Sequence, residues 1–316
     1  MKMDYNETSE ASLIKEYAFS DETSDAKATV YCLFPGIEVA YISAHTSCFD
    51  FTEIEKRALN NYVGFHYCIE GRIEQEVDNE LFYLMPGDLS VVIRDKQIKR
   101  FNIPMKHYHG ISIGIDTEIA PKKFSEFLGN PAFSPEAVAR RLCGVHHSVI
   151  LRSVEPLKHI FTESYEITEE NRLTYLRIKV MELLFQLSIV DISTSLYESV
   201  TVQRSQAECV KRIASYIADN MNDKLSLKEL TTKFGVSDTY LQKSFRAVYG
   251  MPVASFIRAQ KMQKAAQVLI HTDRSVDEIA EEFGYINESK FSAVFKKIMG
   301  DTPSVYRSEH TKLKIL

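Results

Sequence analysis

Several features are scarce in this chain of 316 residues, and each absence removes a class of protein. The five cysteines are an odd number at wide, irregular spacing, and no C-x-x-C pair occurs, which argues against a disulfide framework or a cysteine zinc site. No apolar run approaches the roughly 18 residues that span a bilayer. The first 30 residues are polar and acidic, without the apolar core of a signal peptide. We therefore expect a cytoplasmic protein with reduced thiols and no membrane association.

Positive charge is also scarce, because the net charge is -5. Averaged over the whole chain, this value argues against a nucleic-acid binder, whose footprint is usually basic. The average conceals a division, since residues 205–316 contain 17 Lys and Arg against 13 Asp and Glu, a net charge of +4, and the remainder carries -9. The C-terminal third therefore stays a candidate for binding DNA, with weak affinity for random sequence.

Residues 30 to about 116 consist of short alternating segments separated by turn residues. Val63, Phe65, Tyr67 and Ile69 alternate with smaller or polar residues, as in a half-buried strand. Pro86-Gly87-Asp88 forms a tight turn. Many short strands at even spacing predict a β-barrel or sandwich. The polar residues 1–29 before it are interpreted as a solvated acidic arm.

Beyond about residue 120 the apolar spacing becomes helical. Residues 171–190 contain an apolar stripe at a period near 3.6, which predicts a helix buried against the barrel or against another subunit. It is the candidate dimer helix, with Leu176, Val180, Leu183 and Leu187 as the contact residues. Ile178, Met181, Phe185 and Ile189 widen the apolar surface beyond one face. The Ser- and Thr-rich residues 191–206 are interpreted as a linker.

The last third of the chain contains an internal repeat. Gly235 and Gly284 are 49 residues apart, and Phe234-Gly235-Val236 recurs as Phe283-Gly284-Tyr285. Each unit begins with a serine and a glutamate at capping-box spacing, at Ser226 and Ser275. A helix, a glycine turn and a second helix then follow, which is the helix-turn-helix pattern whose second helix enters the major groove.

The second helix of each unit divides into an inward apolar face and an outward polar face. The outward residues are the predicted base contacts: Thr239, Gln242, Lys243 and Arg246 in the first unit, and Glu288, Ser289, Ser292 and Lys296 in the second. The predicted contacts to the DNA backbone are Ser237, Asn287, Lys290 and Lys297. The second face is chemically poorer, so we expect it to contribute backbone anchoring and shape readout. The same residues would also be compatible with plain solvated helix faces, but the tandem repeat favours DNA.

Residues 252–271 between the two units show the spacing of one continuous helix. Twenty residues at about 1.5 Å each span about 30 Å. Successive turns of the major groove lie about 34 Å apart. One chain is therefore predicted to present two recognition helices to one face of the duplex.

Residues 208–308 resemble the DNA-binding domain of the AraC family of bacterial transcription regulators. The matching stretches are residues 227–230, 234–237, 240–241, 245, 250, 277–280, 283–285, 291–292, 295–297, 300, 302–304 and 306–307. The resemblance implies seven helices, two helix-turn-helix units and sequence-specific binding to double-stranded promoter DNA. Three departures are Thr231 in place of alanine, Lys261 in place of arginine, and Ala293 in place of arginine, the last of which weakens the case for base contacts by the second helix.

The N-terminal half is similar to the cupin-like sensor domain of the same family. This similarity implies a small-molecule effector pocket, for which the candidate residues are Phe65, Tyr67, Tyr83, His107 and His109. His107 and His109 are in phase with Ile111, Ile113 and Ile115, which predicts that they face the barrel interior. They also have a spacing that cupin enzymes use for metal, but the usual first cupin motif is absent, so no metal or cofactor is expected.

The prediction is an α+β protein: a cupin-like β-barrel with following helices at residues 30–190, and an all-α domain with two helix-turn-helix units at 207–316. It would be a non-enzymatic, ligand-responsive activator that binds DNA as a homodimer and contacts RNA polymerase. The effector's identity does not follow from the sequence. Two alternatives remain open, a cupin metalloenzyme with an appended DNA-binding domain, and an architectural DNA binder that needs no effector.

Overall fold

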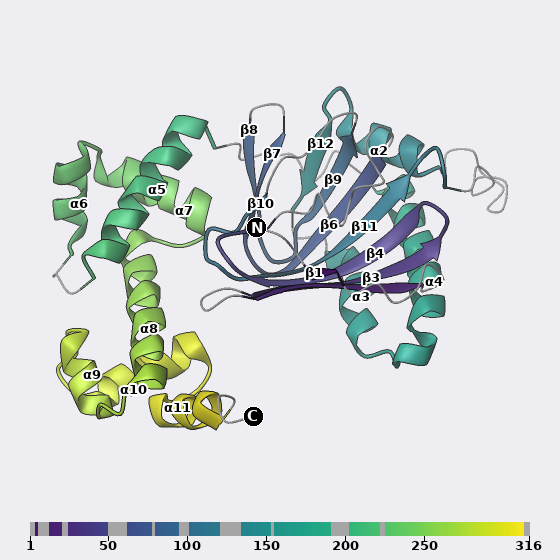
Figure 1. The fold of residues 1–316 in the computed structure, drawn as a ribbon. Helices are drawn as coiled ribbons and strands as arrows, with labels where there is room; N and C mark the ends of the chain where they lie inside the picture. The colour runs from purple at the N-terminus through teal and green to yellow at the C-terminus, as the bar shows by residue number, and fades with distance from the viewer. Residues whose placement is uncertain are drawn as a thin grey trace. The chain divides into compact units, whose positions relative to one another are not determined.

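The computed structural model divides into two compact units, residues 1–204 and 205–316, which are described separately (Figure 1). The described residues are 4–5, 13–20, 25–49, 62–77, 80–94, 101–120, 134–152, 155–190, 202–221 and 225–312. Most of the predicted linker, residues 191–201, lies outside them. None of the described helices is long and apolar enough to cross a membrane.

The N-terminal unit contains two antiparallel sheets. The large sheet has eight strands in the order β1-β2-β3-β4-β11-β6-β9-β12: β1 (Asp4–Tyr5), β2 (Ile14–Ser20), β3 (Asp25–Phe34), β4 (Ile37–His45), β11 (Tyr108–Asp116), β6 (Tyr62–Gly71), β9 (Leu89–Arg94) and β12 (Ser148–Leu151). The small sheet has four strands in the order β5-β10-β7-β8: β5 (Cys48–Phe49), β10 (Phe101–Asn102), β7 (Ile73–Val77) and β8 (Glu80–Leu84).

Two apolar cores lie on opposite faces of the large sheet. One core contains Ala28, Ile42 and Tyr108 of the large sheet together with Ile73 and Leu84 of the small sheet. The other lies between the large sheet and the helices that follow it. Strand β6 is consequently buried on both faces along most of its length, and the expectation of a half-buried strand is wrong because the strand is central and covered on both sides.

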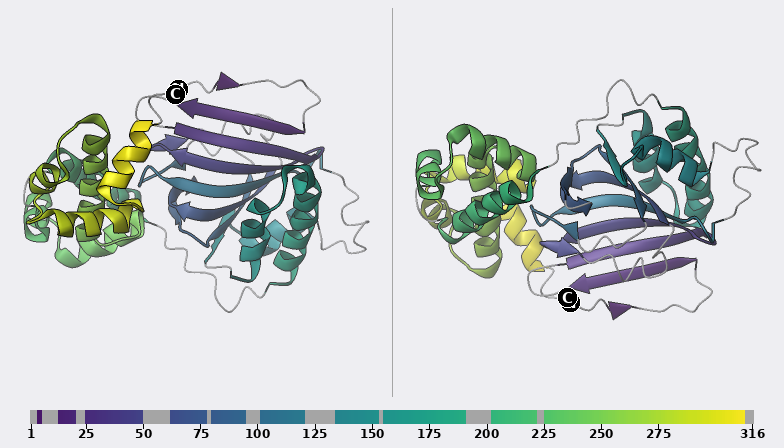
Figure 2. Two further views of the ribbon diagram at one scale, coloured as in Figure 1. Left: turned by 90° about the horizontal axis from the view of Figure 1, so that it is seen from below. Right: turned by 90° about the horizontal axis from the view of Figure 1, so that it is seen from above.

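Three helices cover one face of the large sheet, as the teal helices in Figure 2 show. They are α2 (Pro135–Cys143), α3 (Glu155–Thr162) and α4 (Glu169–Ile189), with a short 3₁₀ turn, η2 (Glu163–Tyr165), between the last two. The predicted dimer residues Leu176, Val180, Leu183 and Leu187 are all buried in this core. The prediction that this stripe contacts a second subunit is therefore corrected, because the sheet of the same chain already covers it.

The predicted acidic arm is also corrected, because most of its C-terminal half is strand. Strand β2 pairs with β3, and β3 pairs with β4. Ala26, Ala28 and Val30 alternate with more exposed residues and reach the core between the sheets. Small alternating apolar residues suffice for a strand beside a close-packed partner, even within an acidic segment.

The C-terminal unit is helical, and the seven helices that the resemblance implies are all present in residues 204–312 where the structure is described. They are α5 (Arg204–Asp219), α6 (Leu227–Phe234), α7 (Asp238–Tyr249), α8 (Val253–His271), α9 (Val276–Glu282), α10 (Glu288–Met299) and α11 (Pro303–Lys312). The α+β fold class, with a β-rich unit, following helices and an all-α unit, is confirmed.

Candidate functional site

The first helix-turn-helix is formed by α6 and α7, and local sequence signals set both ends. Ser226 Oγ accepts from Glu229 N, while the Glu229 carboxylate accepts from Ser226 N at 2.7 Å, completing the predicted capping box. These bonds hold the pKa of Glu229 below its ordinary value. Gly235 ends α6 at φ 65°, a left-handed conformation that a residue with a Cβ adopts at a cost. The turn then passes to Ser237, which caps α7.

Helix α7 has the two faces that a recognition helix needs. Leu241, Phe245 and Val248 are fully buried against the rest of the unit. Thr239, Lys243 and Arg246 are exposed on the opposite side, as predicted from their spacing. A hydroxyl, an ammonium and a guanidinium therefore lie along one solvent-facing strip of a single helix.

Gln242 differs from its neighbours because it is only half exposed. Its side-chain oxygen is buried and accepts no hydrogen bond from the residues that the structure describes. A buried acceptor without a partner costs about 1–3 kcal/mol. The Gln242 oxygen is therefore held in an unfavourable environment, out of reach of solvent.

The second helix-turn-helix repeats this construction in α9 and α10. Ser275 and Glu278 form the second capping box, and the pKa of Glu278 is held below its ordinary value by its bonds to Ser275. Gly284 follows α9 at φ 79°. Asn287 then caps α10 by accepting from Lys290 N at 2.9 Å.

Helix α10 buries Phe291 and Phe295 and turns a smaller polar face outward. Ser292 is half buried, and the other predicted contacts on this helix are exposed: Glu288, Ser289, Lys290, Lys296 and Lys297. Ala293 lies exposed among them, where it offers only a methyl group. The face carries three lysines, so its chemistry suits phosphates more than base edges.

Ser237 and Asn287, the predicted backbone contacts before each recognition helix, both serve as caps. Each uses a side-chain oxygen to accept a helix N–H, so the Ser237 hydroxyl hydrogen and the Asn287 amide hydrogens remain able to donate. Both residues also lie at helix N-termini, where the dipole favours an anion. Their position is compatible with the predicted phosphate contacts.

Helix α8 joins the two helix-turn-helix units and runs between them in Figure 1. Its 19 residues span about 28 Å. Met262, Ala266 and Leu269 pack against the apolar side chains of α9 and α10. Lys261, which stands where the family has arginine, donates to the Phe283 carbonyl at the end of α9, and burial lowers its pKa. This lysine therefore fixes the second unit to the connecting helix.

The five residues predicted to line one effector pocket lie in three separate environments, so that prediction is corrected. Phe65 and Tyr67 face the helix-covered core, where Tyr67 stacks on Phe161 at 4.2 Å between ring centres. Tyr83 lies on β8 of the other sheet and donates to Glu74. Strand alternation identified the aromatic residues, but it could not show which sheet or face each would occupy.

His109 lies near the start of β11, on the same face of the large sheet as Ile111 and Ile113, and His107 directly precedes the strand. This is the helix-covered face, and both side chains are partly exposed. The prediction that they face the interior between the sheets is therefore wrong, because Tyr108 occupies that side. Burial lowers the pKa of His109, and His107 beside it lowers that pKa further.

A buried polar cluster in the N-terminal unit was not predicted. Its members are Arg72, Glu74, Gln75, Asp88 and Ser90, all nearly inaccessible. Asn102 donates to Glu74 at 2.6 Å, Ser90 donates to Gln75 at 3.0 Å, and Arg152 forms an ion pair with Asp88. Burial, reinforced by Arg152, lowers the pKa of Arg72 to about 10. In the sequence, polar residues inside short strands are interpreted as solvent-facing positions. This cluster is therefore revealed only by the way the strands pair in the structure.

Comparisons with known proteins agree with the C-terminal geometry. A helix-turn-helix domain family matches residues 230–309. The HTH-type transcriptional activator AarP of Providencia stuartii is 31% identical over 106 residues, which are 34% of this chain and 78% of AarP. The regulatory protein SoxS of Escherichia coli is 31% identical over 103 residues, or 33% of this chain and 96% of SoxS.

Among solved structures, a transcriptional regulator of the AraC-type DNA-binding domain-containing proteins from Chromobacterium violaceum is 21% identical. The match covers 34% of this chain and 95% of that chain, with a TM-score of 0.33. The sequence matches to AarP and SoxS cover most of each relative. The helix-turn-helix family match at residues 230–309 includes both recognition helices described above. The chain belongs to the AraC family of DNA-binding transcription regulators.

Proposed function

We propose that this protein activates transcription by binding promoter DNA with α7 and α10 in successive turns of the major groove. Thr239, Gln242 and Lys243 read base edges, and Arg246 contacts the adjoining backbone or a guanine. The lysines of α10 anchor the second contact through phosphates. This function has no catalytic step, and it places the protein in the cytoplasm with the bacterial chromosome.

The observation that carries the proposal is the repetition of one construction at both ends of α8. Both units have a capping box, a glycine turn, a capped second helix and an exposed polar strip on that helix. The connecting helix is about 28 Å long, close to the roughly 34 Å repeat of the major groove. If the polar residues only formed solvated helix faces, the two units would not need the same caps, the same glycine turn and the same position of the polar strip on the second helix.

Fluorescence anisotropy with duplexes selected from random sequence tests this proposal. Lys243→Ala should weaken binding and relax the base preference at one position by about 1–3 kcal/mol. Lys296→Ala should weaken binding to all duplexes alike and reduce the slope of log K against log salt by about 0.9. Arg212→Ala is the matched control, because Arg212 is exposed on α5 and lies outside both recognition helices. Equal effects of all three variants would contradict the proposal.

The N-terminal unit is proposed to bind a small-molecule effector between its two sheets, in the manner of a cupin-like sensor. Gln75 of β7 and Ser90 of β9 support this location, because their hydrogen bond joins the two sheets beside the apolar core. A thermal-shift screen of small metabolites tests it, since a bound effector stabilises the folded state. A polar metabolite should raise the melting temperature, and Gln75→Leu should abolish that rise.

We propose that a homodimer forms through the exposed apolar residues on the outward face of α4. The predicted stripe at Leu176, Val180, Leu183 and Leu187 is buried within the chain. Ile178, Phe185 and Ile189 are 61%, 47% and 60% exposed on that helix. A second subunit would add DNA contacts to a domain whose net charge is only +4.

An activator would also contact RNA polymerase. In vitro transcription from the protein's own upstream region, with purified polymerase, measures activation, and an unchanged transcript level would contradict the proposal that this protein is an activator.

A further inference from the structure

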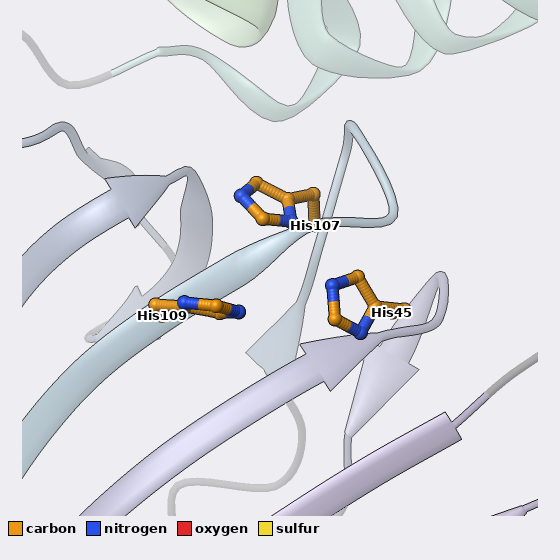
Figure 3. Close-up of side chains that lie close together, drawn as sticks. All are labelled: His45, His107 and His109. Atoms are coloured by element: carbon orange, nitrogen blue, oxygen red, sulfur yellow. The ribbon is translucent and has the colours of Figure 1, made fainter. Parts of the chain in front are cut away.

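Three histidines from two neighbouring strands lie together on one face of the large sheet (Figure 3). His45 ends β4, His109 lies in the adjacent strand β11, and His107 directly precedes that strand. The register pairs Tyr108 with Ala44 and His109 with Ser43, so His107 falls opposite His45. Pairing of β4 with β11 thus assembles the cluster from two segments that are distant in the sequence.

The spacing of the rings matches that of ligands around one small cation. The ring centres are 5.2 Å apart for His45 and His107, 5.6 Å for His45 and His109, and 4.9 Å for His107 and His109. One nitrogen from each ring lies within 4.8 Å of the others. Zinc–nitrogen bonds are about 2.0–2.1 Å long, and a ring centre lies about 1 Å beyond its nitrogen, so tetrahedral ligands have ring centres about 5 Å apart.

Neighbouring polar side chains orient two of the three rings. His45 Nδ1 contacts Asp25 Oδ2 at 3.1 Å, which leaves Nε2 for a metal. His109 Nε2 contacts Ser43 Oγ at 3.1 Å, which leaves Nδ1. Carboxylates and hydroxyls of this kind fix the ring and tautomer of metal-binding histidines.

A carboxylate is also present on the remaining side of the cluster. Glu70 lies opposite His109 on β6, and its Oε2 is 3.3 Å from His107 Nε2 and 3.9 Å from His109 Nδ1. A register shift in β6 beside Gly110 brings Glu70 onto this face. Glu70 therefore lies beside two of the three imidazoles, but outside the group of ligand atoms that all lie within 4.8 Å of one another.

We propose that His45, His107 and His109 bind one divalent transition-metal ion of the zinc class, with water in the fourth position. Imidazole donors select zinc, nickel, cobalt or copper over magnesium and calcium, which prefer oxygen ligands. The three side chains are 43%, 39% and 36% exposed, so the ion has access from solvent without a local opening. The bound ion would join β4 to the start of β11 on the helix-covered side of the sheet.

Zinc titration of the full chain, with any purification tag removed and metal stripped by a chelator, tests this proposal. We expect one Zn²⁺ per chain, competition by Co²⁺ and no binding of Mg²⁺. His45→Gln and His109→Gln should each weaken zinc binding at least tenfold. His146→Gln is the control, because His146 is exposed and lies outside the cluster.

Two further measurements separate a lost site from a lost fold. The metal-free variants should melt as the unaltered chain does, because each replaced ring is partly exposed, whereas only the unaltered chain should gain stability from zinc. Bound Co²⁺ should show the visible absorption of a tetrahedral nitrogen and oxygen site. Zinc affinity unchanged in both cluster variants, equal loss in His146→Gln, or a cobalt–thiolate absorption band would each overturn the proposal.

Discussion

Replacing Gln242 with alanine should affect folding and DNA binding differently. The side-chain oxygen is buried and has no hydrogen-bond partner in the described part of the chain, so its removal relieves about 1 kcal/mol of desolvation cost. Loss of the side-chain methylenes costs about as much again, at roughly 0.8 kcal/mol for each buried group. We therefore expect the free energy of unfolding to change by less than about 1 kcal/mol. A paired contact to an adenine edge contributes about 1–3 kcal/mol, so affinity for the selected duplex should fall about 5- to 150-fold.

Ser244→Ala is the matched control for this variant. Ser244 lies on the same helix but is fully buried, and its Oγ accepts a hydrogen bond from Gln206 Nε2 at 2.7 Å. Its replacement should lower stability by about 1 kcal/mol and leave the affinity of the folded protein for DNA unchanged. Urea unfolding followed by circular dichroism measures stability, since the chain has no tryptophan to report it. The reasoning is refuted if Gln242→Ala is as destabilising as a core truncation, or weakens binding to every duplex equally.

Three further perturbations have expected outcomes. Leu183→Ala should lower the free energy of unfolding by about 2–5 kcal/mol, because Leu183 is fully buried. Phe185→Ser should leave the free energy of unfolding nearly unchanged, because Phe185 is exposed, and sedimentation should show that it converts a dimer to a monomer. Arg152→Ala should cost about 3 kcal/mol in urea unfolding, because the buried Asp88 carboxylate loses its ion pair with the Arg152 guanidinium. Glu229 has a folded pKa below its unfolded value, so its contribution is present above about pH 4.3 and is lost as pH falls through the folded pKa. Glu229→Gln should therefore flatten the acid side of the stability profile measured by thermal melts.

The two helix-turn-helix units were predictable because their determinants are local. A capping box joins residues three apart, and a glycine turn needs only one left-handed residue. The inward and outward faces of α7 follow from a period of 3.6, which holds wherever the helix is placed. The same signals recur about 50 residues later, and this repetition supports the helix-turn-helix prediction without any information on tertiary contacts.

The arrangement of the N-terminal unit was harder to predict because it depends on which elements pair. Helix α4 is apolar on more than one side, and periodicity cannot show which side meets the sheet. The sheet covers Leu183 and leaves Phe185 exposed, the opposite of the predicted dimer stripe. His45 was overlooked for the same reason, since only the register of β4 with β11 brings it beside His107 and His109.

The most direct test of the central claim is a hydroxyl-radical footprint of the full chain on DNA selected from random sequence. The account predicts, for each chain, two protected segments about 10 bp apart on one face of the duplex. Thr239→Ala with Lys243→Ala should remove one segment, and Ser289→Ala with Lys296→Ala should weaken the other. A single protected segment per chain, or equal protection of unselected DNA, would contradict it.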